Sequence, residues 1–296
     1  MTSQSPNAAP ARAPRRATWR PSALSLPGDV TVAVFEAGRV ERDAPTIVFV
    51  HGMGHWTQAA WDFVAAEFEE THRIVGFDLP GFGRSSKPER AYTLDFFAAV
   101  LAETIAAYAP QARVTLVGHS LGGLIAGIYA AERAETIGAL VLVDPAGFLR
   151  TPGLVLKMIG SRPVQALMRK IRPSPNFVRR TFRNAVHDAA TIPDDYYERA
   201  VELANDPAML RSFTDVYANA MAQFIRLEAL HARLAAFRGA TSLVWGREDR
   251  FVPVKGLDAA RAVYPQATAL VIERCGHCPS IEHPGVLAAA IRKAMS

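Results

Sequence analysis

A serine, an aspartate and a histidine that could act together in nucleophilic hydrolysis each follow an apolar run of this chain. Ser120 is the middle residue of the pentapeptide 118–122, Gly-His-Ser-Leu-Gly, which comes after the run 114–117 and before a helical pattern rich in small residues. Gly-x-Ser-x-Gly between a strand and a helix is typical of a sharp, strained turn that exposes the serine hydroxyl. A side chain at either flanking position, Gly118 or Gly122, would collide inside so tight a turn. The pattern therefore predicts Ser120 as a nucleophile.

A serine nucleophile needs a general base, and that base needs a partner that orients it. His277 follows the last apolar run of the chain, and Asp249 follows the run before it. We expect both loops at the carboxyl ends of their strands, on the side of the sheet where Ser120 is exposed. This placement predicts His277 as the base and Asp249 as the acid, with Glu248 and Asp144 as rival acids. The other histidines beyond Ser120 are expected in helices or at their start, without a catalytic role: His187, His231 and His283.

Backbone N–H groups that could stabilise a tetrahedral oxyanion are expected at two places. One is the N–H of Leu121, the residue after the nucleophile. The other belongs to the loop 51–56, His-Gly-Met-Gly-His-Trp, which follows the apolar run 46–50. Glycines in this loop let the backbone approach a reacting carbonyl closely. We predict the N–H of Met53 as the second donor, with that of Gly54 as the alternative.

Short apolar runs alternate with helical patterns over most of the chain, as expected of an α/β protein. The later runs lack polar alternation, which is typical of parallel strands buried on both faces of a sheet. Apolar residues recur at helical spacing in 61–68 and in 97–108, the latter after a predicted N-cap at Thr93. We therefore predict an α/β fold with a mostly parallel central sheet and helices on both faces. The expected strands are 30–35, 46–50, 74–77, 114–117, 139–143, 242–245 and 269–272.

The alternation of strands and helices stops between Asp144 and Thr241. This stretch looks helical and is too long for an irregular loop, so we predict a helical insert, or cap, over residues 148–238. The core then consists of residues 21–147 and 239–296. Residues 1–20 are rich in Ala, Pro, Ser and Arg and have no periodicity, and they are predicted to form a disordered tail.

As a set, these motifs resemble those of the α/β-hydrolase fold family, in its cap-bearing branch of serine esterases, lipases and carbon–carbon bond hydrolases. The resemblance covers residues 29–295 apart from the insert. By this resemblance, Ser120, Asp249 and His277 take the nucleophile, acid and base positions. A branch with an aspartate nucleophile is disfavoured because position 120 is serine. The matching segments are His51-Gly52, 77–85 (Phe-Asp-Leu-Pro-Gly-Phe-Gly-Arg-Ser), 118–122, 143–147 (Val-Asp-Pro-Ala-Gly), 246–249, and Gly276-His277 with Pro279 and Glu282.

The motifs and the resemblance imply a serine hydrolase that cleaves carboxylic esters through an acyl-enzyme intermediate, without a metal or an organic cofactor. Apolar residues near the start of the insert suggest a small substrate with an apolar acyl or aryl group. Candidate substrate contacts are Trp56, Phe148, Leu149 and Met158. A carbon–carbon bond hydrolase of ring meta-cleavage products would have the same fold and triad. A non-catalytic ligand receptor with this fold is a further alternative.

Charge is unevenly distributed along the chain. Of its 296 residues, 33 are basic and 28 acidic, and the stretches 1–28 and 150–187 contain thirteen of the basic residues and no acidic one. No interleaved basic and aromatic pattern, helix-turn-helix or zinc-finger spacing accompanies this excess, so we expect no nucleic-acid partner. In the insert, apolar residues recur at helical spacing among basic ones, namely Val164, Leu167, Met168 and Ile171. We favour a helix packed on the core, and contact with a lipid interface is the alternative.

Half of the residues are hydrophobic, which fits a folded protein with a sizeable core. No apolar run reaches the roughly 18 residues of a membrane-spanning helix, and no secretory signal follows the N-terminal arginines, so we expect a cytoplasmic protein. Cys275 and Cys278 match a Cys-x-x-Cys pattern, but their place near the carboxyl end disfavours a thioredoxin-like redox site. No distant second pair completes a zinc site. The sequence does not indicate an oligomeric state.

Overall fold

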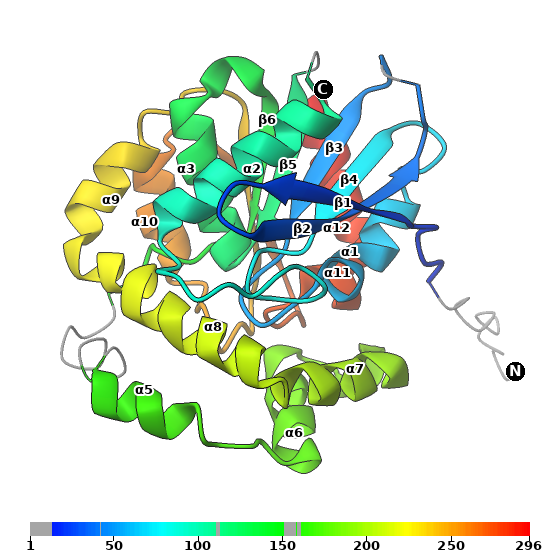
Figure 1. The fold of residues 1–296 in the computed structure, drawn as a ribbon. Coiled ribbons are helices and arrows are strands. Elements are labelled where there is room, and N and C mark those ends of the chain that lie inside the picture. The colour runs from blue at the N-terminus through cyan, green and yellow to red at the C-terminus, as the bar shows by residue number, and fades with distance from the viewer. Residues whose placement is uncertain (1–13, 42, 111–112, 151–157, 159–160) are drawn as a thin grey trace, which may run out of the picture.

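The computed structural model describes residues 14–296 except 42, 111–112, 151–157 and 159–160. An eight-stranded sheet runs through its centre in the order β1-β2-β4-β3-β5-β6-β7-β8 (Figure 1). β2 pairs antiparallel with both β1 and β4, and the remaining neighbours pair in parallel. The mostly parallel sheet predicted from the sequence is therefore confirmed.

Seven strands coincide with the predicted apolar runs. They are β2 (Val30–Gly38), β3 (Thr46–Val50), β4 (Arg73–Phe77), β5 (Val114–His119), β6 (Ile137–Val143), β7 (Thr241–Gly246) and β8 (Thr268–Ile272). One strand, β1 (Arg20–Leu26), was not predicted from the sequence, and it lies at the edge of the sheet. Its residues are mostly exposed and bury little apolar surface, so no apolar run marks it.

Helices cover both faces of the sheet. Successive residues of a strand point to opposite faces, and Ile47 and Phe49 of β3 pack in a different apolar cluster from Val48 and Val50. Thr93 caps α2 by accepting a hydrogen bond from the N–H of Phe96 at 3.1 Å, which confirms the predicted N-cap. On one face lie α1 (Thr57–Ala66), α11 (Pro279–Glu282) and α12 (Pro284–Met295), and on the other lie α2 (Leu94–Tyr108), α3 (Leu121–Glu132) and α10 (Gly256–Val263) (Figure 1).

Helices without strands fill the described chain between β6 and β7. They are α5 (Arg162–Met168), α6 (Pro175–Ala185), α7 (Asp194–Ala204), α8 (Pro207–Asn219) and α9 (Leu227–Leu234). Short 3-10 turns lie among them at Ala189–Thr191 and Met221–Arg226, and another lies between α3 and β6 at Ala134–Thr136. We call the described part of residues 148–238 the insert. Its helices α5 to α8 lie together at one end of the molecule, away from α2 and α3 (Figure 1). Among the residues described, no helix is both long and apolar enough to cross a membrane.

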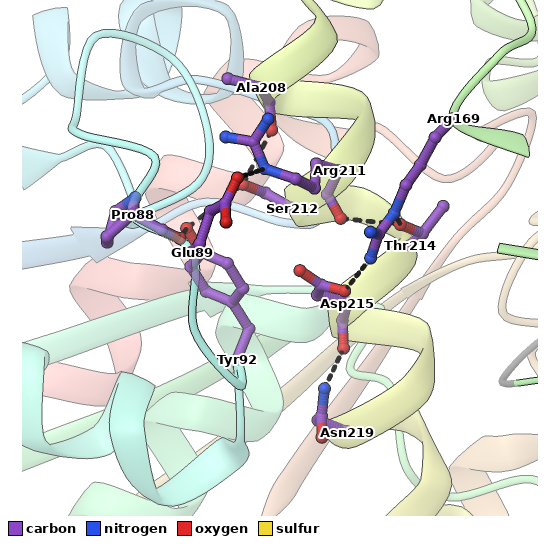
Figure 2. Close-up of polar contacts among 10 residues, drawn as sticks. All are labelled: Pro88, Glu89, Tyr92, Arg169, Ala208, Arg211, Ser212, Thr214, Asp215 and Asn219. Carbon is purple, nitrogen blue, oxygen red and sulfur yellow. Dashed lines mark hydrogen bonds and ion pairs between the residues drawn. The ribbon is translucent and has the colours of Figure 1, made fainter. Parts of the chain in front are cut away.

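Polar contacts attach α8 to the core and α5 to α8 (Figure 2). On the core side, the hydroxyl oxygens of Ser212 and Tyr92 lie 3.2 Å apart, and Tyr92 in turn donates to the carbonyl oxygen of Pro88 at 2.9 Å. On the other side, the guanidinium of Arg169 donates to a carboxylate oxygen of Asp215 at 2.6 Å. α8 therefore connects the core to the outermost helix of the insert.

The α5 helix differs from the expectation of a helix packed on the core. None of its residues is buried, and Leu167 is 63% exposed. Ile171, just after the helix, is 51% exposed. Val164 and Met168 are half-buried, so the apolar side of α5 is only partly covered, and the helix contacts α8, to which Arg169 also bonds.

Residues 14–19 lie within the predicted disordered tail, but they have defined contacts, and Arg20 already belongs to β1. Trp19 donates its indole N–H to Asp62 of α1 at 2.6 Å. Arg16 donates two hydrogen bonds to Asp195 of α7, at 2.6 and 2.7 Å, and its guanidinium lies over the ring of Tyr196. These long-range contacts correct the predicted tail from residue 14 onward, and residues 1–13 lie outside the described part.

Candidate active site

Ser120 occupies a strained turn between β5 and α3. Its backbone has φ 54° and ψ −120°, a conformation that costs energy for any residue with a Cβ. Backbone bonds from the neighbouring strand hold the turn, since the N–H of Ser120 donates to Val143 and the N–H of Ala146 donates to Ser120. A Cβ at Gly118 would lie 2.4 Å from the carbonyl oxygen of Gly122, which requires glycine at 118. A Cβ at Gly122 would lie 2.4 Å from the carbonyl oxygens of Val50 and His51, which requires glycine at 122.

Asp249 and His277 come together from loops that follow β7 and β8. Nδ1 of His277 lies 2.6 Å from Oδ2 of Asp249, and both side chains are almost fully buried. Because a carboxylate only accepts, Nδ1 carries the proton and Nε2 is left as an acceptor. The other oxygen of Asp249 accepts the N–H groups of Phe251 and Val252 at 2.7 and 2.9 Å. The carboxylate is thus fixed by three donors.

His119, the residue before Ser120, packs against the ring of His277 with 4.6 Å between ring centroids. Its Nε2 donates to the backbone carbonyl oxygen of His277 at 2.6 Å. Burial lowers the pKa of His119 well below the ordinary value, with further lowering by the nearby His277 and His55. His119 is therefore a neutral donor that links the turn at Ser120 to the loop of His277.

The loop after β3 lies against the turn at Ser120. A Cβ built on Gly52 would lie 3.0 Å from Cβ of Ser120, so only glycine allows this approach. His51 fixes the base of the loop, since its Nε2 accepts the N–H of Leu79 at 2.9 Å and its Nδ1 donates to the carbonyl oxygen of Gly52 at 2.7 Å. Asp78 adds a second anchor by accepting two hydrogen bonds from Thr57, at 2.7 and 2.8 Å.

The predicted oxyanion donors lie at the two sides of this contact. Leu121 is the first residue of α3, where backbone N–H groups have no partner within the helix. Met53 and Gly54 lie in the loop beside Ser120, and Gly54 has φ 75°. The geometry leaves both as candidates for the second donor.

His55, next in the loop, contributes a neutral imidazole. Burial lowers its pKa to about 3, with smaller contributions from His51 and His277. Its Nδ1 is buried and has no hydrogen-bond partner. The ring lies 5.6 Å from the ring of Phe182 in the insert, measured between centroids, so the loop and the insert meet at this residue.

The loop of His277 is also tied to the insert. The N–H of His277 donates to the carbonyl oxygen of Ala185 at 2.6 Å. Glu282 accepts the N–H of Gly276 with one oxygen and the N–H groups of His187 and Asp188 with the other, at distances of 2.7, 2.7 and 3.1 Å. The same carboxylate therefore holds the loop of His277 and the end of α6 together.

The four candidate substrate contacts have different environments. Trp56 is buried and packs edge-on against Tyr196 of the insert. Phe148 is buried in the core, stacked on His231, and Leu149 lies half-buried near Gly256 of α10. Met158 is 55% exposed. Of the four, Trp56 lies in the loop that adjoins Ser120.

Three groups that could bind a metal lie close together in the described chain. Ligand-type atoms of His119, Asp144 and His277 lie within 4.8 Å of one another and form the one such cluster in the described chain. Both histidines donate one ring N–H to a protein acceptor, His119 to the backbone carbonyl oxygen of His277 and His277 to Asp249. Cys275 and Cys278 are buried and free, and burial raises the pKa of both thiols, which disfavours the thiolate that binds metals.

Several residues of this site were not identified from the sequence. In the sequence, Asp78 and Glu282 are noted only as part of the segments that match the family, and His119 only as the second residue of the pentapeptide 118–122. An acid followed closely by two glycines, as in 78–83, was an available signal for Asp78, since a Cβ at Gly83 would lie 2.1 Å from its carboxylate. His119 and Glu282 act across long separations in the chain, which no local pattern reveals.

Residues 45–284 match the family model of the α/β hydrolase fold, and the chain belongs to this family. The sheet order and the strained serine turn described above agree with that assignment.

Individual relatives have several activities. The chain is 30% identical over 252 residues to a pimeloyl-[acyl-carrier protein] methyl ester esterase of Aeromonas salmonicida, covering 83% of this chain and 94% of the relative. It is 28% identical over 247 residues to a 2-hydroxy-6-oxononadienedioate/2-hydroxy-6-oxononatrienedioate hydrolase of Cupriavidus pinatubonensis, covering 81% and 83%. Among solved structures, a bacterial membrane phospholipase A superposes with a TM-score of 0.74 at 26% identity, over 94% of this chain and 86% of that one.

Proposed function

We propose that this protein is a serine hydrolase that cleaves carboxylic esters with an apolar acyl or aryl group. The observation that carries the proposal is the 2.6 Å hydrogen bond between Asp249 and His277, which fixes the tautomer of a buried imidazole. This pair comes from loops at the carboxyl ends of parallel strands, on the same side of the sheet as the strained Ser120. A related ester hydrolase, the methyl ester esterase of Aeromonas salmonicida, supports the substrate class.

The reaction proceeds in two steps. Nε2 of His277 takes the proton of the Ser120 hydroxyl while its oxygen attacks the ester carbonyl, and the N–H groups of Leu121 and of Met53 or Gly54 stabilise the oxyanion. His277 then gives the proton to the leaving alcohol, and an acyl-enzyme remains. In the second step His277 takes a proton from water, the hydroxide attacks the acyl group, and the acid leaves as Ser120 regains its proton. Asp249 stabilises the imidazolium in both steps.

An apolar group in the substrate is supported by the side chains around the serine turn. Trp56, His55 and Phe182 contribute aromatic rings where the loop after β3 meets the insert. The neutral state of His55 keeps this surface uncharged at physiological pH. Phe148, Leu149 and Met158 remain candidate contacts on the same proposal.

Hydrolysis of ester bonds is tested with p-nitrophenyl esters of increasing acyl length, assayed on the wild type and on Ser120→Ala. We expect the longer apolar esters to be cleaved by the wild type and no ester to be cleaved by Ser120→Ala. A vinylogous diketone of the ring meta-cleavage type serves as a second substrate. Faster cleavage of the diketone would replace the ester proposal with carbon–carbon bond hydrolysis, an activity named for several relatives.

Covalent labelling separates an enzyme from a ligand receptor. A fluorophosphonate probe reacts only with an activated serine, so we expect it to label the wild type and not Ser120→Ala. Absence of label on correctly folded wild-type protein would contradict both hydrolase proposals and favour the non-catalytic receptor.

We further propose that the outer helices of the insert contact an anionic lipid surface. Met158, Leu167, Ile171 and Phe177 are each more than half exposed, and they are four of the eight exposed large hydrophobic residues in the described chain. The segment 150–187 around them contains nine basic residues and no acidic one. Exposed apolar side chains among cations match the chemistry of an anionic membrane interface.

Vesicle binding tests this contact. We expect the protein to sediment with phosphatidylglycerol vesicles and not with phosphatidylcholine vesicles, and the double variant Leu167→Ser with Phe177→Ser to lose this binding. Val286→Ser is the matched control, because Val286 is a 44% exposed apolar residue of α12, outside the basic segment. Binding that is unaffected by the double variant would contradict the proposal.

A further inference from the structure

Asp144 follows β6 in the same way that Ser120 follows β5. It is fully buried and has φ 43°, one of four positive values at non-glycine residues in the described chain. Its backbone N–H donates to Val244 of the neighbouring strand β7. A strained, buried acid at the strand end next to the serine turn has no part in the proposed triad, so its presence calls for a physical reason.

The two oxygens of the Asp144 side chain have unequal surroundings. Oδ1 accepts the N–H of Gly246 at 2.8 Å. Oδ2 is buried, and no hydrogen-bond donor of the described protein reaches it. An ionised carboxylate with an unsatisfied buried oxygen would be costly, whereas a protonated oxygen is itself a donor and needs an acceptor.

The carboxylate of Asp249 is an acceptor close to Asp144. It is bonded to Nδ1 of His277 at 2.6 Å, and a carboxylate oxygen of Asp144 lies within 4.8 Å of a ring nitrogen of His277. A side-chain hydrogen bond between the two acids is also among the causes that raise the pKa of Asp144. Two carboxylates in contact do not both ionise, so one of them keeps a proton. Asp249 is stabilised as the anion, because it accepts the N–H groups of Phe251 and Val252 as well as Nδ1–H of His277. Asp144 has a single donor and is the one that stays neutral.

We propose that Asp144 is a positioning residue: as a neutral carboxylic acid, its Oδ2–H donates a hydrogen bond to Asp249 and holds that carboxylate in line with Nδ1 of His277. The proposal rests on the proposed catalytic roles of Asp249 and His277. Burial, and then the negative charge of Asp249, raise the pKa of Asp144 well above the ordinary value, which agrees with the neutral form. The other titratable groups that face Asp144 are His119, His277, Glu282, Cys275 and Cys278.

The Asp144→Asn variant tests the protonation state. Asparagine has nearly the shape of the neutral acid: its amide oxygen can accept the N–H of Gly246, and its NH₂ can donate to Asp249. We expect kcat/KM on the preferred ester, and the acid limb of its pH profile, to match the wild type. A shift of the acid limb to lower pH would overturn the proposal, because it would mean that a negative charge close to His277 had been removed.

The Asp144→Ala variant tests the hydrogen bond. Without the donor, the Asp249 carboxylate is less well held, so we expect kcat to fall by about tenfold or more while KM stays within about twofold. Full activity in folded Asp144→Ala would overturn the positioning role. If Asp144→Ala does not fold, the combination of normal activity and an unmoved acid limb in Asp144→Asn still decides the question.

A stability measurement tests the same protonation without using activity, so it stands even if the ester proposal fails. An acid whose pKa is raised on folding loses its proton on unfolding at neutral pH, and the free energy of unfolding then falls as the pH rises above the ordinary aspartate pKa. Asparagine has no such dependence. We expect the difference between the urea midpoints of Asp144→Asn and the wild type to become more positive as the pH rises from 5 to 8. A relative midpoint that does not change with pH, as expected for the exposed control Asp43→Asn, would overturn the proposal.

Discussion

The backbone N–H of His277 donates a hydrogen bond to the carbonyl oxygen of Ala185, the last residue of α6, at 2.6 Å. The loop that carries the proposed base is therefore bonded directly to the insert. A Cβ at Gly276 would lie 2.5 Å from the same carbonyl oxygen, so the contact also requires glycine before His277. Any displacement of the end of α6 would change the position of the imidazole, and α6 is thus part of the machinery that orients the base.

Glu282 should be important for activity although it is not a member of the triad. Its carboxylate accepts one N–H of the His277 loop and two N–H groups at the end of α6. We expect Glu282→Ala to reduce kcat by about 10- to 100-fold, because small displacements of a catalytic group are costly. Kinetics on the preferred ester measure this. Glu273→Ala, which removes an exposed carboxylate paired with Arg247, is the control, and equal rates for both variants would contradict the prediction.

Asp249→Asn should nearly abolish turnover while leaving the fold intact. An amide NH₂ facing Nδ1 of His277 favours the wrong tautomer, with the proton on Nε2. In serine protease triads the same change lowers kcat by about 10⁴. We expect a loss of similar size, with KM little changed. Circular dichroism checks the fold. A loss of less than about tenfold would mean that another acid, such as Asp144, performs this role.

Elements whose residues are contiguous could be predicted from the sequence. Strands β2 to β8 and the N-cap at Thr93 were predicted because burial and capping leave local patterns. The turn at Ser120 was predicted because its sequence pattern, Gly-x-Ser-x-Gly between a strand and a helix, is contiguous, and the contact that requires Gly118 lies within the same turn. β1 was missed, since its mostly exposed residues form no apolar run.

Contacts between distant parts of the chain could not be predicted in the same way. The bond from His119 to His277 joins residues 158 positions apart, and nothing local distinguishes this histidine from a surface one. The apolar residues at the start of the insert were equally ambiguous, because such side chains can face either the substrate or the core. Phe148 packs against His231 and Tyr264, which could be learned only from the structure.

The serine turn should not tolerate a methyl group at Gly122. A Cβ there would lie 2.4 Å from the backbone carbonyl oxygens of Val50 and His51, and backbone atoms cannot move aside cheaply. We expect Gly122→Ala to lower the free energy of unfolding by about 3 kcal/mol or more. Gly285→Ala in α12 is the matched control, since nothing lies within 4 Å of its Cβ, and it should be neutral or stabilising by up to about 1 kcal/mol. Urea denaturation measures both, and similar midpoints would contradict the expectation.

Three buried histidines should make the fold sensitive to acid. Burial lowers the pKa of His51, His55 and His119, that of His55 to about 3. Below about pH 6.5 the unfolded chain binds protons that the folded protein does not. The free energy of unfolding therefore decreases as the pH is lowered, by about 1.4 kcal/mol per pH unit for each such group. For His55 this continues down to about pH 3.

His55→Phe isolates one of these contributions. Phenylalanine fits among the rings of Trp56 and Phe182, and no hydrogen bond to Nδ1 is lost. We expect urea unfolding of this variant to show a smaller loss of stability between pH 6.5 and pH 5 than the wild type, and similar stability trends above pH 7. An unchanged slope below pH 6.5 would mean that His55 is protonated in the folded protein.

The segment before β1 joins the core to the insert through two side chains, Arg16 and Trp19. Arg16 pairs with Asp195 of α7 and lies 4.0 Å from Asp62 of α1, while Trp19 bonds to Asp62 directly. A shortened protein that begins at residue 20 would keep every strand and the proposed triad, yet it would lack these contacts between the core and α7. Purification tags and trimming sites should therefore be placed before residue 14, because a boundary drawn at the first strand would change how firmly the insert is held while leaving the chemistry in place.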